Sequence, residues 1–204
     1  MNILGVEVPL AAMAGFLSAT IAGVAALLVW LQWRERQFRK DDVLKWANEV
    51  ISNLQTLYIL LFLGKENFGE EAILTELKTI TIRTSVLVEQ GRLFFRNKAD
   101  GEHGKDKHGA YQGYRAELLD PIVVAHQIAA QWDTADIGTR RRMTLIAEDC
   151  VRRFVSFAQM EVGRSRTVSI HTARAGRGDH LGTLMEALSA DRIEALRSRE
   201  RNSL

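Results

Sequence analysis

Arg166 and His171 are the residues of this chain whose types and spacing best fit a chemical reaction. A histidine can move a proton to or from a ribose 2′-OH or a leaving oxygen, and a nearby arginine can steady the charge that builds on phosphorus. Such a pair would cleave RNA without a metal. Arg164 with His171, and Arg174 with His180, fit a similar spacing. The alternative is a surface histidine that lies among arginines.

Other catalytic patterns are missing from the sequence. It holds no glycine-rich phosphate loop and no serine nucleophile elbow. Glu148 and Asp149 are adjacent, so their carboxylates diverge on a helix. The single cysteine, Cys150, excludes an internal disulfide, and the apolar helical face around it predicts a buried thiol. We therefore expect no metal, no cofactor and no small-molecule substrate.

The stretch that must position everything else is residues 8–31, which carries no charge. About 24 residues in a helix span roughly 36 Å, enough to cross a bilayer core of about 30 Å. Trp30 and Trp33 follow at its far end, and the next charges are basic, whereas Glu7 is the only charge before it. The positive-inside rule then predicts a single-pass anchor, with the N-terminus outside and everything after Gln32 in the cytoplasm. A buried helix of a soluble domain is the alternative reading.

Small residues recur every four positions within this stretch. They let two helix backbones approach closely, which is how helices associate in lipid. The spacing predicts self-association, against the alternative that Ala and Gly are simply frequent in membrane helices. The residues concerned are Ala11, Gly15, Ala19 and Gly23.

The remainder, residues 34–204, is predicted to form one all-α cytosolic domain after an anchor over residues 1–33. Apolar residues at spacings of three and four predict helices over 34–63, 70–90, 122–132, 136–162 and 181–199, with a short helix over 111–119. Gly64 and Gly91 are read as helix ends, and Asp120 with Pro121 as a helix start. Residues 98–110 are Gly-rich and charged, which predicts a mobile loop. His103 and His108 lie there, but this composition is typical of solvated loops rather than of metal sites.

Two short segments look specific rather than merely helical. They contain two arginines, Arg92 and Arg115. The simpler interpretation of each is an ion pair within the bundle, for instance with Asp120. The two phenylalanines are expected in the core. The segments contain Gly91, Arg92, Phe94, Phe95 and Asn97 in the first, and Tyr114, Arg115 and Asp120 in the second.

In the order of these features the chain resembles small membrane accessory proteins of bacterial defence, in particular the accessory family of type VI-B CRISPR systems. The resemblance implies a HEPN-like helical bundle, homo-oligomerisation into a membrane pore, and stronger antiviral defence through membrane depolarisation. It also implies that Arg166 and His171 are the HEPN-type Arg-x4-His pair. An RNA-guided CRISPR effector or RNA is the implied partner, beside the lipid bilayer, which the resemblance implies is the bacterial inner membrane.

Whether the chain is an enzyme stays open at this point. A pore-forming accessory protein is one hypothesis, and a membrane-tethered, metal-independent HEPN ribonuclease is the second. The third is a non-catalytic scaffold whose basic C-terminal third binds a partner or anionic lipid. The formal net charge of +2 shows no strong nucleic-acid signature for the whole chain.

Overall fold

The computed structural model describes residues 2–3, 6–7, 10–98, 102–161 and 178–202 of the 204-residue chain. Within these ranges, the side chains of residues 2–3, 6–7, 10–17, 32–33, 35–39, 65–66 and 200–202 lie outside the description. The chain divides into two compact units, Met1–Asp42 and Val43–Leu204.

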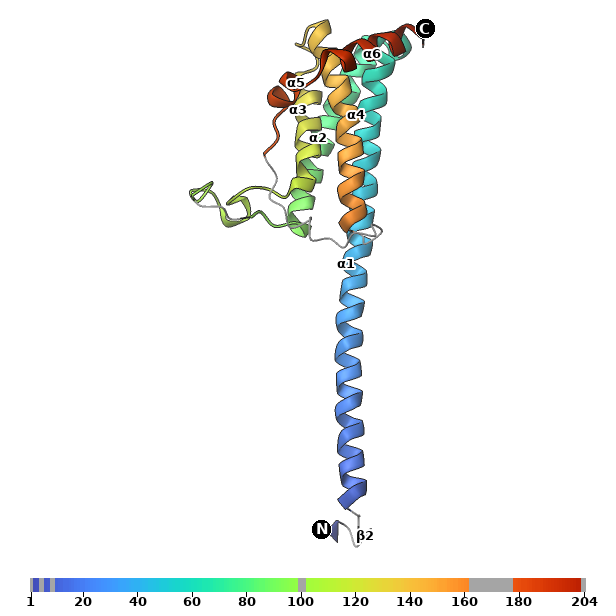
Figure 1. Cartoon of the computed structure of the whole chain (residues 1–204), viewed down its shortest axis with the longest axis vertical. Coiled ribbons are helices and arrows are strands. Elements are labelled where there is room, and N and C mark those ends of the chain that lie inside the picture. Colours follow the sequence, from blue (N-terminus) through green and yellow to red (C-terminus); the bar gives the residue numbers. More distant parts are fainter. Residues whose placement is uncertain (1, 4–5, 8–9, 99–101, 162–177, 203–204) are drawn as a thin grey trace. The chain divides into compact units, whose positions relative to one another are not determined.

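The first unit contains a small hairpin and the first part of a long helix. Strands β1 (Asn2–Ile3) and β2 (Val6–Glu7) pair antiparallel, a feature that the sequence pattern did not predict. Helix α1 (Leu10–Phe68) begins three residues later and continues into the second unit (Figure 1). In the part of the chain that the structure describes, no helix combines the length and apolarity needed to cross a membrane.

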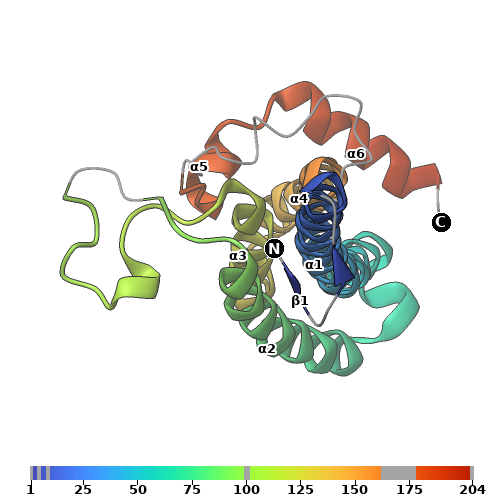
Figure 2. The same cartoon turned by 90° about the horizontal axis from the view of Figure 1, so that it is seen from below.

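The second unit is a helical bundle, which confirms the all-α prediction. Its other helices are α2 (Glu70–Phe94), α3 (Asp120–Gln131), α4 (Ile137–Glu161), α5 (Leu181–Glu186) and α6 (Ala190–Asn202). The predicted short helix over 111–119 contains only one full 3-10 turn, η2 (Glu117–Leu119). A second 3-10 turn, η1 (Gly109–Tyr111), lies mostly in the segment that was predicted to be a loop. Buried residues of α1 between Val43 and Leu61 and of helices α2, α3 and α4 form one hydrophobic core, and Figure 2 looks along these helices.

The predicted apolar seams form this core. Every member of the α1 seam and of the α2 face is buried, and aromatic rings join the layers. The Trp46 ring lies 5.5 Å from that of Phe154 and 5.6 Å from that of Phe95, measured between centroids. The confirmed seam residues are Val43, Ala47, Val50, Leu54, Leu57 and Leu61 on α1, and Ile73, Leu77, Ile80, Thr84 and Leu87 on α2.

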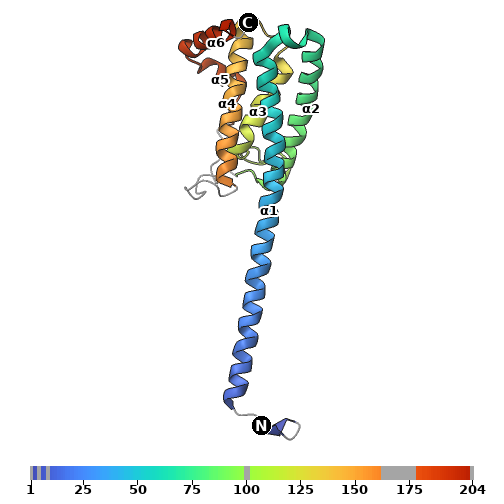
Figure 3. The ribbon, with the colours of Figure 1, turned by 90° about the vertical axis from the view of Figure 1, so that its right-hand side faces the viewer.

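The C-terminal helices lie against α4, on the side away from α2 (Figure 3). The guanidinium of Arg192 on α6 makes two hydrogen bonds of 2.8 Å to the carboxylate of Asp149 on α4. A single helix over 181–199 was predicted, and this prediction was wrong, because the helix is interrupted between α5 and α6. Leu181 and Leu196 are fully buried, so both pieces still contribute to the apolar contacts of the unit.

Two glycines and one acid–proline pair play different parts in the helix ends. Gly64 has φ 67° and ψ −169°, which breaks the helical path as predicted. Gly91 does not end α2, which continues to Phe94. Asp120 and Pro121 lie inside the first turn of α3, so Asp120 is not the cap. At α4 the cap is Asp136, whose carboxylate accepts hydrogen bonds from the Thr139 backbone N–H (3.0 Å) and hydroxyl (2.8 Å). These bonds lower the pKa of Asp136.

Candidate functional site

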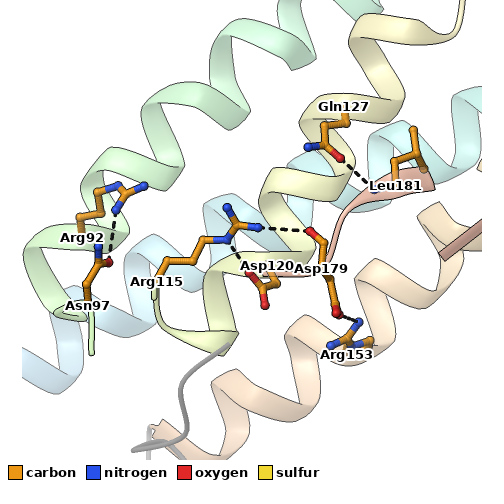
Figure 4. Close-up of polar contacts among 8 residues, drawn as sticks. All are labelled: Arg92, Asn97, Arg115, Asp120, Gln127, Arg153, Asp179 and Leu181. Carbon is orange, nitrogen blue, oxygen red and sulfur yellow. Dashed lines mark hydrogen bonds and ion pairs between the residues drawn. The ribbon is translucent and has the colours of Figure 1, made fainter. Parts of the chain in front are cut away.

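The two segments singled out in the sequence come together at one end of the bundle. The C-terminal turn of α2 brings Arg92, and the chain leading into α3 brings Tyr114 and Arg115 (Figure 4 shows the two arginines). The backbone groups of Lys98 and Tyr114 exchange two hydrogen bonds of 2.8 Å, which closes the loop between the segments. The loop that was predicted to be mobile therefore has a fixed base in the structure.

Arg115 is held by a buried ion pair with Asp120, as the simpler interpretation of the sequence predicted. The Asp120 side chain is fully buried, and its second oxygen, Oδ2, has no partner among the described residues. Burial raises the pKa of Asp120, and the hydrogen bond and charge of Arg115 oppose that rise. The pair therefore links the chain just before η2 to the first turn of α3.

The same arginine reaches the chain that enters α5. Arg115 Nη2 donates to the backbone carbonyl of Asp179 at 3.2 Å, and Arg153 Nη1 on α4 pairs with the Asp179 carboxylate at 2.5 Å. Gln127 Oε1 on α3 accepts the backbone N–H of Leu181 at 2.9 Å. These contacts hold residues 179–181 against α3 and α4 (Figure 4).

Arg92 lies across the site from Arg115. Its Nη1 donates to Asn97 Oδ1 at 3.3 Å, and its guanidinium carbon lies 4.7 Å from the centre of the Tyr111 ring. Glu89 lies 3.4 Å from Arg92 Nε and accepts the Tyr111 hydroxyl at 2.8 Å. The hydrogen bond to Glu89 raises the pKa of Tyr111. The predicted ion pair of Arg92 within the bundle is thus present, with Glu89 rather than Asp120 as the partner.

A pocket of about 380 Å³ opens between the two arginines. Its lining includes Arg92, Lys107 and Arg115, and neither Asp nor Glu is among the described residues that line it. The rings of His103 and Tyr114 stack at its edge, with centroids 4.1 Å apart. The three basic side chains suit this pocket to hold an anion.

The phenylalanines of the first segment have a different part. Phe95 is buried, and the Phe94 ring lies 6.1 Å from that of Trp46 and 6.3 Å from that of Phe95. Gly91 lies beneath Trp46. These residues anchor the end of α2 in the core, as expected from sequence, and do not line the pocket.

The structure describes only some of the other candidate residues from the sequence. Arg164, Arg166, His171 and Arg174 lie outside the described residues, as do the side chains of Ala11 and Gly15. Ala19 and Gly23 are both exposed on α1. A Cβ added at Gly23 would meet no atom of the described residues within 4 Å. His180 is described, and its Nδ1 accepts the Gly182 backbone N–H at 3.4 Å.

Several residues of the site were missed by sequence reasoning. Gln127, Asp179 and Arg153 are brought together from α3, α4 and the entry to α5, and no local pattern marks them. Lys107 stands in a charged loop where nothing distinguishes it from its neighbours. No protein-family model matches the chain, and the searches of curated proteins and of solved structures also found no match.

Proposed function

We propose that residues 8–31 anchor this protein in a lipid bilayer, with the helical bundle on the cytoplasmic side. The supporting observation is a set of large apolar side chains on α1 that are between 42% and 66% exposed. Five of them are consecutive, and at 3.6 residues per turn they sample the whole circumference of the helix. A helix that is apolar all round normally lies in a core or in lipid. The set is Ile21, Val24, Leu27, Leu28, Val29, Trp30 and Leu31.

The proposed orientation rests on charge. Four basic residues follow the apolar stretch, and none precedes it; they are Arg34, Arg36, Arg39 and Lys40. An excess of Lys and Arg marks the cytoplasmic side of a span. The Arg34 guanidinium lies 5.4 Å from the centre of the Trp30 ring, which suits an interfacial position for both.

Membrane extraction tests the anchor. The full chain is expected in the membrane fraction and to resist alkaline carbonate. The double variant Ile21→Lys/Val24→Lys is expected to leave it, since each central lysine costs about 2.5–3.5 kcal/mol of insertion. The matched control is Ile82→Lys/Val86→Lys, which changes two equally exposed residues of α2. Recovery of the unchanged chain in the soluble fraction would refute the anchor.

We further propose that copies of the chain assemble through the anchor into a pore. The support is the small-residue spacing that includes Ala19 and Gly23, and the open space beside Gly23. Because a Cβ at Gly23 meets no atom of the described residues within 4 Å, we expect Gly23→Leu to act on contacts with another molecule. Cross-linking is expected to show oligomers for the unchanged chain and for the control Val29→Leu, and monomers for Gly23→Leu.

The proposed consequence is membrane depolarisation in support of antiviral defence. The resemblance of the two central segments to CRISPR accessory proteins supports this role. A voltage-sensitive dye should report depolarisation when the protein is expressed with an RNA-guided effector and a matching phage target. The Gly23→Leu variant should abolish the change. An unaltered potential with a fully assembled protein would refute the pore.

A further inference from the structure

The pocket between Arg92 and Arg115 presents hydrogen-bond donors that the fold leaves without acceptors. Asn97 and Gln127 both line it, and each uses its amide oxygen within the protein. Asn97 Oδ1 accepts from Arg92 Nη1 at 3.3 Å, and Gln127 Oε1 accepts from the Leu181 backbone N–H at 2.9 Å. These donors determine which end of each amide is the oxygen. The two –NH₂ groups therefore remain as donors, with no acceptor found among the described residues.

The cations of the pocket add to this surplus. Arg92 Nε is buried and makes no hydrogen bond within the described structure, although Glu89 lies 3.4 Å away. Arg115 Nε donates to Asp120 and Nη2 donates to the Asp179 carbonyl, whereas Nη1 has no acceptor among the described residues. Lys107 is exposed and lines the pocket. No Asp or Glu is among the described residues of the lining that could balance its charge. Glu89 and Asp120 balance the two arginines, which leaves Lys107 as the excess charge.

A ligand for this pocket must bring several acceptor oxygens and negative charge. A phosphate group has both, and Arg forks and amide –NH₂ groups are among its usual partners. The volume of about 380 Å³ lies at the small end of ligand sites, so it fits a metabolite rather than a polymer. We propose that the pocket binds the phosphate group of a small phosphate ester. This inference does not depend on the proposed anchor, because every residue that carries it lies in the second unit.

Calorimetric titration of the full chain, in detergent if the membrane holds it, tests the proposal. The probes are adenosine 5′-monophosphate, glucose 6-phosphate, inorganic phosphate and adenosine. The two esters are expected to bind below about 1 mM, and adenosine is expected not to bind. Binding of inorganic phosphate as tightly as of the esters would identify a free-anion site and overturn the ester assignment.

Isosteric variants give the sharper test, because they keep the folded contacts. Gln127→Glu and Asn97→Asp retain the oxygen that accepts the internal hydrogen bond, replace the free –NH₂ and add a negative charge. Each should weaken ester binding by about tenfold or more, which is the loss of one charge-assisted hydrogen bond. Lys107→Gln should weaken it several-fold.

Matched controls make these changes outside the pocket. Gln131→Glu adds the same charge on α3, and Lys105→Gln removes the same charge from the loop. Neither should alter the dissociation constant of the esters by more than about twofold. An unchanged melting temperature confirms that each variant folds. The proposal is overturned by no ester binding up to about 10 mM, by equal weakening in the controls, or by binding of RNA alone.

Discussion

The indole Nε1–H of Trp46 on α1 donates a hydrogen bond of 3.0 Å to the backbone carbonyl of Leu87 on α2. One turn further along α2, Gly91 lies under the same indole. A Cβ added there would stand 2.8 Å from Trp46 Cζ2 and would overlap Leu119 Cδ2. Gly91 is helical, so it is needed for this close approach and not for an unusual backbone conformation.

Replacing Gly91 with Ala should therefore destabilise the bundle. Overpacking of a tight core costs about 1–3 kcal/mol, which outweighs the gain of about 1 kcal/mol in helix propensity. Contacts below 3.0 Å with both Trp46 and Leu119 place the cost at the upper end of this range. We therefore expect a net loss of about 2 kcal/mol, or a fall of roughly 4–8 °C in Tm. Gly109→Ala is the control, because a Cβ there meets nothing within 4 Å. Equal Tm values for Gly91→Ala and the unchanged chain would contradict the close packing.

Asn53 offers a change in the opposite direction. Its side chain is 5% exposed, and neither its amide oxygen nor its nitrogen has a partner among the described residues. A buried polar group without a hydrogen bond costs about 1–3 kcal/mol. Asn53→Leu keeps the number of heavy atoms and replaces the amide oxygen and nitrogen with methyl groups, so it should raise the free energy of unfolding by about that amount. Asn53 also borders a groove of about 370 Å³, which has room for the slightly larger methyl groups.

The matched control for this change is Asn48→Leu, at an exposed position of the same helix. Its effect should stay within about 0.5 kcal/mol, as is usual for surface substitutions. A lower Tm for Asn53→Leu than for the unchanged chain would mean that the amide has a partner of its own in solution.

Asp120 makes stability depend on pH. Burial raises its pKa in the folded state above the unfolded value of 3.8, against the pull of Arg115. The folded state therefore binds the proton more tightly, so its stability relative to a non-titrating variant is greatest below pH 3.8 and falls as pH rises through the folded pKa. Asp120→Asn is that variant, and it keeps an oxygen for Arg115 Nε.

Thermal unfolding of both proteins across this acid range measures the effect. The Tm of the unchanged chain minus that of Asp120→Asn should decrease with rising pH and then level off. Asp133→Asn, the same substitution at an exposed position, is the matched control. A difference that increases with pH would show that the charge of Arg115 outweighs the burial of Asp120.

Local periodicity was enough to predict most of the bundle. The seam from Val43 to Leu61 and the α2 face depend only on a repeat of three and four residues, and both are buried. The Arg115–Asp120 ion pair could also be predicted from the sequence, because its two residues lie only five positions apart. The contacts of Gln127 with Leu181, 54 residues away, depend on how helices pack and leave no local trace.

Glycine positions show the same limit. At Gly64 the left-handed φ and the helix break agree with the reading of glycine as a stop. At Gly91 the identical residue serves a close contact with Trp46, which only the arrangement of α1, α2 and η2 explains. Sequence alone distinguishes the two cases poorly, because each glycine follows an equally regular apolar repeat.

The reactivity of Cys150 tests how tightly α4 packs against the core. The thiol is 3% exposed, and burial raises its pKa to about 12, so almost none of it is thiolate at pH 8. Since it is the single cysteine of the chain, iodoacetamide labelling reports on this site alone. The native protein should stay unlabelled at pH 8 while it is labelled rapidly in guanidinium chloride. Ser156→Cys in a Cys150→Ala background, on the exposed face of the same helix, should react in the native state. Rapid native labelling of Cys150 would mean that α4 separates from the core on the timescale of the reaction.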